Sequence, residues 1–285
     1  MKNILVPTDF SSHAEYAFDA ALQLARKFDA HVHLITIPAP GFMPSGGDKI
    51  ATQGPTGQER ERLEQKMKDW SAPHSDLSFL YYVGFGKLVD VLKTYVDEHG
   101  IDLIVMGSHG ASGKSEYFVG SNTQKVVRSV HCPVLVIKDK LEDIKFDKVI
   151  FASNFNKNEE QAFMAFKNFI KHFVPEIHLV MVHTSSLFDP PYTLSKEVMK
   201  DFQQLCEPFQ SEIHIYRDFT VEQGIRSFAE EIGARLIAMS NHNRHPLKRM
   251  LIGSNVEALV NHSHLPVLSV DYAQRDSFHA EETTT

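Results

Sequence analysis

Cysteine is scarce in this sequence. Its 285 residues include two cysteines, Cys132 and Cys206, which lie far apart and form no C-x-x-C pair. A cysteine-based zinc knuckle and a thioredoxin-like redox motif both need such a pair, so both are excluded. So few thiols suit a reducing compartment, and we expect a cytoplasmic protein.

Long apolar runs and an excess of positive charge are also missing. The apolar run near the N-terminus is too short for a signal peptide, and no stretch approaches the ~20 apolar residues that a membrane helix needs. The net charge is −7, whereas a surface that follows a DNA or RNA backbone needs clustered Lys and Arg. We therefore expect neither a membrane nor a nucleic acid as a partner. A small anion is still a possible ligand, because backbone N–H groups at a helix N-terminus hold phosphate without net positive charge.

What the sequence does contain is an internal repeat. Residues 3–10 match residues 148–155 at an offset of 145, and residues 120–122 match residues 253–255 at an offset of 133. The first copy is therefore longer by 12 residues. The excess lies between about Pro38 and Gly86, where a composition rich in Gly and Pro predicts a flexible loop.

Two globular domains follow from the repeat and from the composition, which is 42% hydrophobic and 23% charged. We expect domains at residues 1–141 and 142–272 and a disordered polar tail at 273–285. Alternating strand and helix patterns predict an α/β fold in which each domain is an open, five-stranded parallel sheet flanked by helices. In the first copy the predicted strands are 2–7, 31–37, 77–83, 102–107 and 133–137, and the helices are 12–28, 57–70, 86–99 and 120–130. In the second copy the strands are 147–152, 176–182, 211–217, 235–239 and 266–270, and the helices are 157–173, 193–206, 220–232 and 254–262.

A glycine-rich segment follows the fourth predicted strand of the first copy. Gly107 ends that strand, Gly110 follows, and Gly120 and Ser121 open the next helix. Glycines let the backbone approach a ligand, and the free N–H groups of a helix start attract an anion. In an open parallel sheet, ligands bind beyond the carboxyl ends of the strands, which is where this segment lies. The pattern predicts a phosphate site.

The spacing of these residues resembles the ATP-binding signature of the universal stress protein family. Gly107 is followed after two residues by Gly110, and after nine more by Gly120 and Ser121; the opening Val6-Pro7-Thr8-Asp9-Phe10-Ser11 also resembles the first strand of that family. The resemblance implies roles for seven residues: the adenine end is held by Asp9 and Ile37, the ribose lies by Gly107, and the phosphates are held by Gly110, Gly120, Ser121 and Asn122. It also implies ATP, ADP or AMP as the ligand, with Mg²⁺ as a plausible companion of the phosphates.

The same resemblance implies the arrangement of the strands and of the two copies. Each sheet is expected to have the order 3-2-1-4-5. The copies are expected to pair as an internal pseudo-dimer through their last strands, 133–137 and 266–270. Further homo-oligomerisation and an unidentified protein partner stay open.

The second copy departs from the nucleotide-binding pattern. Ser240, Asn243 and Asn154 stand where the first copy has Gly107, Gly110 and Asp9, and only Gly253-Ser254 is retained. Each lost glycine adds a Cβ along the expected phosphate path, so we expect a degenerate second site. It either serves as a scaffold or binds a different ligand.

Other motifs are weaker. The segment 108–115 resembles a P-loop but has Ser108 in place of the first glycine and follows the fourth strand rather than the first. The 16 histidines are read as surface or structural residues, because sequence alone shows no three of them converging on a metal. No nucleophile-and-base set stands out, so we expect a nucleotide-binding, stress-response regulatory protein with at most weak ATP hydrolysis. The alternatives are a slow ATPase or autophosphorylating enzyme, and an ATP-independent scaffold that uses the second domain.

Overall fold

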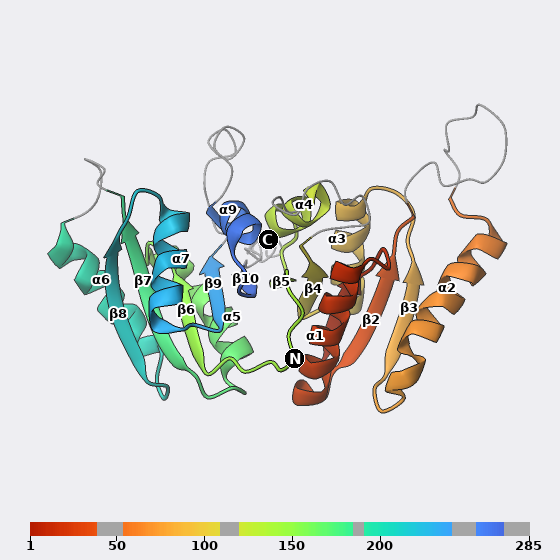
Figure 1. Ribbon diagram of the computed structural model, residues 1–285, viewed down its shortest axis with the longest axis horizontal. Helices are drawn as coiled ribbons and strands as arrows, with labels where there is room; N and C mark the ends of the chain where they lie inside the picture. The colour runs from red at the N-terminus through yellow and green to blue at the C-terminus, as the bar shows by residue number, and fades with distance from the viewer. Residues whose placement is uncertain (39–53, 109–119, 185–190, 241–254, 271–285) are drawn as a thin grey trace, which may run out of the picture.

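The structure is a computed structural model that describes residues 1–38, 54–108, 120–184, 191–240 and 255–270 (Figure 1). In the first domain the strands are β1 (Asn3–Pro7), β2 (His31–Thr36), β3 (Phe79–Val83), β4 (Leu103–Gly107) and β5 (Val134–Ile137). Its helices are α1 (Ser12–Phe28), α2 (Gly57–Ser71), α3 (Leu88–His99) and α4 (Ser121–Ser129), with a 3-10 turn, η1 (Ala72–His74), after α2.

The second domain repeats this order. Its strands are β6 (Lys148–Ala152), β7 (Glu176–His183), β8 (Ser211–Arg217), β9 (Leu236–Ser240) and β10 (Val267–Val270). Its helices are α5 (Glu160–Ile170), α6 (Tyr192–Leu205), α7 (Val221–Ile232) and α9 (Asn255–His262), with a 3-10 turn, η2 (Lys157–Glu159), before α5. Every strand and helix predicted from the sequence is present.

Local sequence signals explain where several helices begin and end. Ser11 caps α1 by accepting a hydrogen bond from the N–H of Ala14, and Thr56 forms a capping box with Glu59 at the start of α2. Gly100 ends α3 in the left-handed conformation, with φ of 58°. None of the helices in the described ranges is long and apolar enough to cross a membrane.

Two helices have boundaries that differ from the prediction. The helix predicted from residue 86 begins at Leu88, because Gly86 has φ of +118°, which a helix cannot contain. The helix predicted at 157–173 is a 3-10 turn followed by α5, which ends at Ile170. A capping box between Asn156 and Glu159 marks the predicted start at residue 157, but the first turn is 3-10 and the α-helix begins at Glu160.

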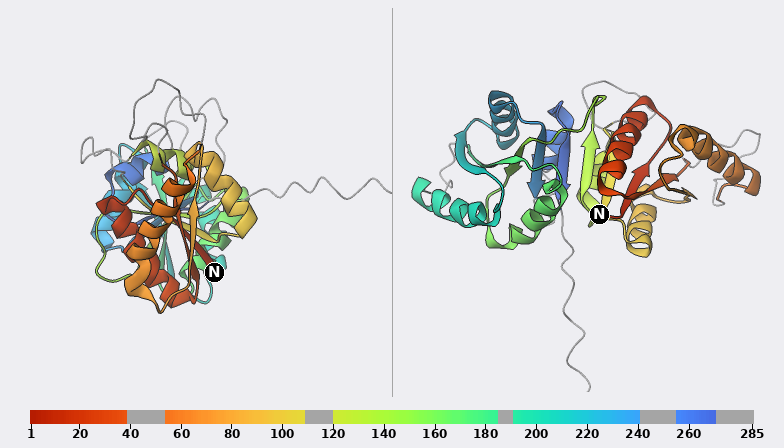
Figure 2. Two further views of the ribbon diagram at one scale, coloured as in Figure 1. Left: turned by 90° about the vertical axis from the view of Figure 1, so that its right-hand side faces the viewer. Right: turned by 90° about the horizontal axis from the view of Figure 1, so that it is seen from below.

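The strands form one open sheet with the order β3-β2-β1-β4-β5-β10-β9-β6-β7-β8. Each half has the predicted order 3-2-1-4-5, and neighbouring strands within each half are parallel. The halves join where β10 pairs antiparallel with β5, with Leu268 opposite Leu135. The expected internal pairing through the last strands is confirmed, and Figures 1 and 2 show the two halves side by side around this junction.

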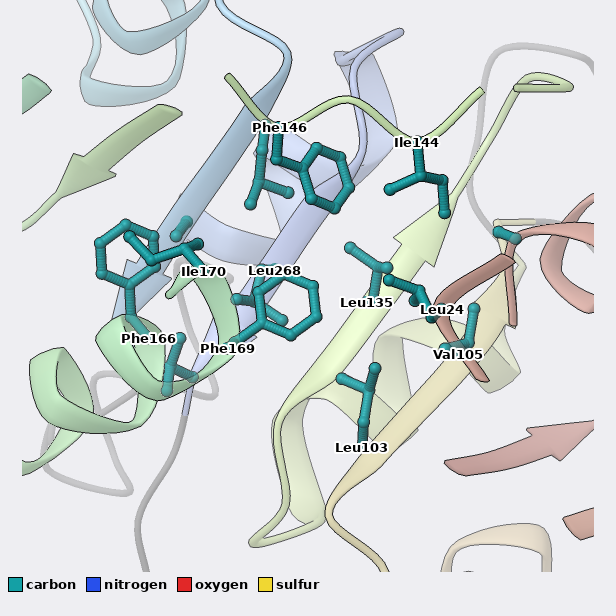
Figure 3. Packing of buried hydrophobic residues seen from close by; sticks show 14 of the residues in the cluster. Leu24, Leu103, Val105, Leu135, Ile144, Phe146, Phe166, Phe169, Ile170 and Leu268 are labelled. Carbon is teal, nitrogen blue, oxygen red and sulfur yellow. The ribbon is translucent and has the colours of Figure 1, made fainter. Parts of the chain in front are cut away.

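Side chains alternate between the two faces of the sheet and build a core on each. On one face the core lies under α1, α2, α5 and α6, and on the other under α3, α4, α7 and α9. Figure 3 shows the first of these cores at the junction, where Leu135 and Leu268 lie between Leu24 of the first domain and Phe169 of the second. The core continues across the junction, so the domains share it.

Candidate functional site

A cleft opens at the carboxyl ends of β1 and β4, where the strand order of the first domain reverses direction. Six of the seven residues predicted for nucleotide binding line it: Asp9, Ile37, Gly107, Gly120, Ser121 and Asn122. The seventh, Gly110, lies outside the described residues. The structure therefore brings together residues that follow β1 and β2, the last residue of β4 and the start of α4.

The Asp9 side chain is positioned by the tight turn between β1 and α1. Its Oδ1 accepts a hydrogen bond from the N–H of Ser11 at 3.0 Å, and the N–H of Phe10 donates to Oγ1 of Thr8 at 2.9 Å. Phe10 has φ of 62°, a left-handed conformation that reverses the chain here. The exposed Asp9 carboxylate is therefore held at the rim of the cleft rather than swinging freely.

Gly107 is required by packing. A Cβ at this position would lie 2.5 Å from the carbonyl oxygen of His13, in the first turn of α1. The sequence suggested that glycine is needed here for close approach to a ligand. The contact in the structure is with α1, which lies directly against the end of β4.

The start of α4 presents backbone donors to the cleft. Gly120 is the N-cap residue and has no side chain that could accept from the first N–H groups of the helix. Its own N–H donates to the carbonyl oxygen of Ser108 at 2.8 Å, and the buried Thr123 hydroxyl donates to the carbonyl oxygen of Gly107 at 2.8 Å. These two bonds fix the helix start against the end of β4. The positive end of the α4 dipole thus faces the cleft, as an anion site requires.

The opposite wall of the cleft is apolar. It is formed by Ile35, Ile37, Leu88 and Met106. Gly84 makes room for this wall, because a Cβ there would lie 2.8 Å from Cγ1 of Ile37. One cleft therefore combines an apolar wall, a carboxylate and a helix N-terminus.

The equivalent place in the second domain is built differently. The turn is the same: Phe155 has φ of 56° and its N–H donates to Oγ of Ser153 at 2.8 Å. However, Glu159 stands where the first domain has Ala14, a residue that lines the cleft. The Glu159 carboxylate accepts from Oγ of Ser153 at 2.8 Å and from the N–H of Asn156 at 3.0 Å. With 8% of its surface exposed, this acidic side chain is buried at the position where the first domain has only the methyl group of Ala14.

Glu159 was not identified from the sequence. The offset that aligns Asp9 with Asn154 also aligns Ala14 with Glu159, and an apolar-to-acidic change at a helix start beside an expected phosphate site is a usable signal. Ser240, which replaces Gly107, lies at the end of β9 as predicted. Asn243, Gly253 and Ser254 lie outside the described residues.

Known proteins that resemble this chain are universal stress proteins. The universal stress protein family matches this chain twice, at residues 1–138 and 145–271. A universal stress protein of Methanocaldococcus jannaschii is 31% identical over 145 residues, which are 48% of this chain and 82% of that protein. One of Bacillus subtilis is 25% identical over 147 residues, which are 47% of this chain and 97% of that protein.

Among solved structures, a universal stress protein from Archaeoglobus fulgidus superposes with a TM-score of 0.72 at 21% identity, covering 95% of this chain and 97% of that chain. At this identity the likeness shows the fold, and it extends over both domains. With the family matched over both halves of the sequence, the chain belongs to the universal stress protein family and carries two tandem copies of its domain.

Proposed function

We propose that the first domain binds an adenine nucleotide, ATP with ADP and AMP as close alternatives, in the cleft between β1 and β4. The observation that carries the proposal is the meeting of Asp9, the apolar wall at Ile37 and the N-terminus of α4 around one cleft. A flat, apolar base with polar edges suits the wall and the carboxylate. A polyphosphate suits the helix N-terminus.

Within this proposal, Asp9 and Ile37 hold the adenine end and Gly107 lies beside the ribose. The phosphates lie against Gly120, Ser121 and Asn122, with Gly110 completing the site. Mg²⁺ would be held chiefly by phosphate oxygens and water, as is usual for this ion.

The second domain lacks this activity in our proposal. Its buried Glu159 carboxylate occupies the position of Ala14 and would repel a phosphate, and Asn154 has no charge to match Asp9. The two domains then have different tasks, with nucleotide binding in the first and a supporting role in the second.

The biological role that we propose is regulatory. As a member of the universal stress protein family, the chain would signal through the nucleotide-bound state of its first domain rather than by turnover. A ligand changes the surface shown to partners only by binding one conformation better than another. The rival reading, a slow ATPase or autophosphorylating enzyme, needs a base in line with the γ-phosphate. Asp9 is the carboxylate that lines the described part of the cleft, so phosphate release that disappears in Asp9→Ala would favour this rival.

The test exchanges one residue between the domains. Ala14→Glu introduces into the first domain the carboxylate that the second domain already accommodates, and Glu159→Ala is the matched control. Thermal unfolding is followed during titration with ATP and Mg²⁺, where a ligand at ~100 times its Kd stabilises the fold by about 2.7 kcal/mol.

We expect a stabilising shift for the wild type and for Glu159→Ala, and none for Ala14→Glu. A shift that persists in Ala14→Glu would place the nucleotide elsewhere. A wild type that does not respond would argue against nucleotide binding and leave the ATP-independent scaffold.

A further inference from the structure

A cluster of ionisable side chains lies in the second domain, far along the sheet from the cleft. The tripeptide Glu-Ile-His occurs twice, as residues 176–178 on β7 and 212–214 on β8. The strands are parallel neighbours, with His178 opposite Glu212. Because alternate residues of a strand share a face, both glutamates and both histidines lie on one face of the sheet. α7 packs against the sheet here (Figure 1). Its Phe228 ring lies 4.7 Å from the His214 ring.

The distances within this cluster suit a single metal ion. Nδ1 of His178 lies 3.0 Å from Nε2 of His214, and that Nε2 lies 3.5 Å from Oε2 of Glu212. One ligand atom from each of these three residues lies within 4.8 Å of the others. Two nitrogens bound to one tetrahedral Zn²⁺ at 2.0–2.1 Å are roughly 3.3 Å apart. The side chains need only small adjustments to share an ion.

The second nitrogen of the His178 ring, Nε2, also has surroundings that suit a metal-binding histidine. Nε2 of His178 is buried and has no hydrogen-bond partner among the described residues, although Oε1 of Glu176 lies 3.4 Å away. The second oxygen of Glu176 lies 3.7 Å from the Lys148 ammonium group, which orients the carboxylate. A histidine that binds metal through one nitrogen commonly donates the other N–H to a carboxylate. Glu176 is placed to accept that bond.

The first domain shows that the fold does not require this cluster. His33 is the counterpart of His178, and its ring nitrogens lie 3.0 Å from the Tyr95 hydroxyl and 3.4 Å from Oδ1 of Asn3. The second domain has Phe228 in place of Tyr95, so the hydroxyl partner is lost.

The edge strands β3 and β8 differ in the opposite sense, because the second domain gains polar side chains there. The strand register places Leu80 beside His33, where the second domain has Glu212 beside His178, and Tyr82 corresponds to His214. In the second domain the histidine–tyrosine hydrogen bond of the first domain is thus replaced by a hydrogen bond between two imidazoles, with a carboxylate beside them.

We propose that His178, His214 and Glu212 bind a divalent transition-metal ion, with Zn²⁺ as the first choice, and that Glu176 positions His178. Imidazole and carboxylate ligands suit this class of ion, and three protein ligands leave a position for water. His178 is buried, whereas the Glu212 side chain is 62% exposed at the edge strand β8, so the ion has a path from solvent. The proposal is independent of nucleotide binding in the first domain.

The test uses the full chain without an affinity tag and titrates Zn²⁺ by calorimetry, with Co²⁺ as a spectroscopic substitute. The variants are Glu212→Gln and His214→Tyr, the second of which introduces the residue found at this place in the first domain. His264→Ala, at an exposed histidine beside Asp139, is the control.

We expect one Zn²⁺ per chain at this site, a loss of affinity of at least 100-fold in both ligand variants, and no change in the control. Glu176→Gln should weaken binding by roughly 10- to 100-fold without abolishing it. Zn²⁺ binding that survives in the combined Glu212→Gln and His214→Tyr variant would overturn the proposal.

A measurement on the wild type alone guards against variants that fail to fold. Co²⁺ in a four-coordinate site with nitrogen ligands absorbs visible light strongly, and we expect that spectrum, displaced by one equivalent of Zn²⁺. The weak absorption of hydrated Co²⁺ alone would overturn the assignment.

Discussion

Single residues decide how the two domains differ. Gly107 allows α1 to lie against the end of β4, because any Cβ there would meet the carbonyl group of His13. Ala14 lines the cleft of the first domain, whereas the second domain has the buried carboxylate of Glu159 at this position. His33 is hydrogen-bonded to the Tyr95 hydroxyl, whereas its counterpart His178 is hydrogen-bonded to a second imidazole, that of His214. In the second domain Ser240, Glu159 and Phe228 stand at the positions of Gly107, Ala14 and Tyr95, and the helix after the first strand opens with a 3-10 turn.

The buried His33 gives the stability of the fold a pH dependence. Burial, together with the charges of His99 and His31, lowers the pKa of His33 from about 6.5 to about 4. Between these values the unfolded chain binds a proton that the folded chain does not, so the free energy of unfolding falls as pH falls from 6.5 towards 4.

Urea unfolding of the wild type and of His33→Asn at pH 7.5 and at pH 4.5 measures this contribution. We expect the wild type to lose more stability than the variant on acidification. An equal loss in both proteins would show that His33 does not carry the effect.

At the scale of elements, the start of α4 matters most. Its position depends on the buried Thr123 hydroxyl, which donates to the carbonyl oxygen of Gly107 at 2.8 Å and so ties the helix to β4. The donors of the proposed phosphate site move with this helix start.

Thr123→Val keeps the shape of the side chain and removes the hydroxyl. We expect a loss of about 1 kcal/mol in the free energy of unfolding, and weaker ATP binding because the helix start is no longer fixed. Thr123→Ser keeps the hydroxyl and should retain ATP affinity. Equal ATP affinity in wild type and Thr123→Val would show that this bond does not position the site.

At the scale of the whole molecule, the two domains share a sheet and a core. Leu268 is fully buried opposite Leu135 where β10 meets β5, and the aromatic side chains of α5 pack beside it (Figure 3). We therefore expect both domains to unfold in one transition.

Leu268→Ala should lower the free energy of unfolding by about 2–5 kcal/mol, as for other large-to-small changes in a core. Leu80→Ala, at a side chain that is 41% exposed, is the control and should have little effect. Calorimetry that resolves two transitions, with only one shifted by Leu268→Ala, would contradict a shared cooperative unit.

Much of the fold is predictable from the sequence because the chain contains an internal repeat, so each copy can be checked against the other. The repeat and the alternating strand and helix patterns predict all ten strands and the helices between them. The resemblance to a family then supplies the strand order and the pairing of the last strands. The errors are local: Gly86 delays the start of α3, and the first turn before α5 is 3-10 rather than α, because local backbone geometry rather than periodicity decides these details.

The candidate site is predictable in part. The family resemblance carried by the glycine spacing and by Asp9 implies seven site residues, six of which line the cleft. The packing role of Gly107 depends on the approach of α1, which no local pattern encodes. The histidine cluster was missed because its members lie on two strands. The repeated Glu-Ile-His tripeptide on strands predicted to be neighbours was the available signal.

We propose above that one domain of the two binds an adenine nucleotide. Isothermal titration calorimetry of the full chain with ATP and Mg²⁺ measures how many nucleotides each chain binds. We predict one ATP per chain for the wild type and no binding to Ala14→Glu. Two ATP per chain would show that the second domain also binds, and none would show that neither domain does.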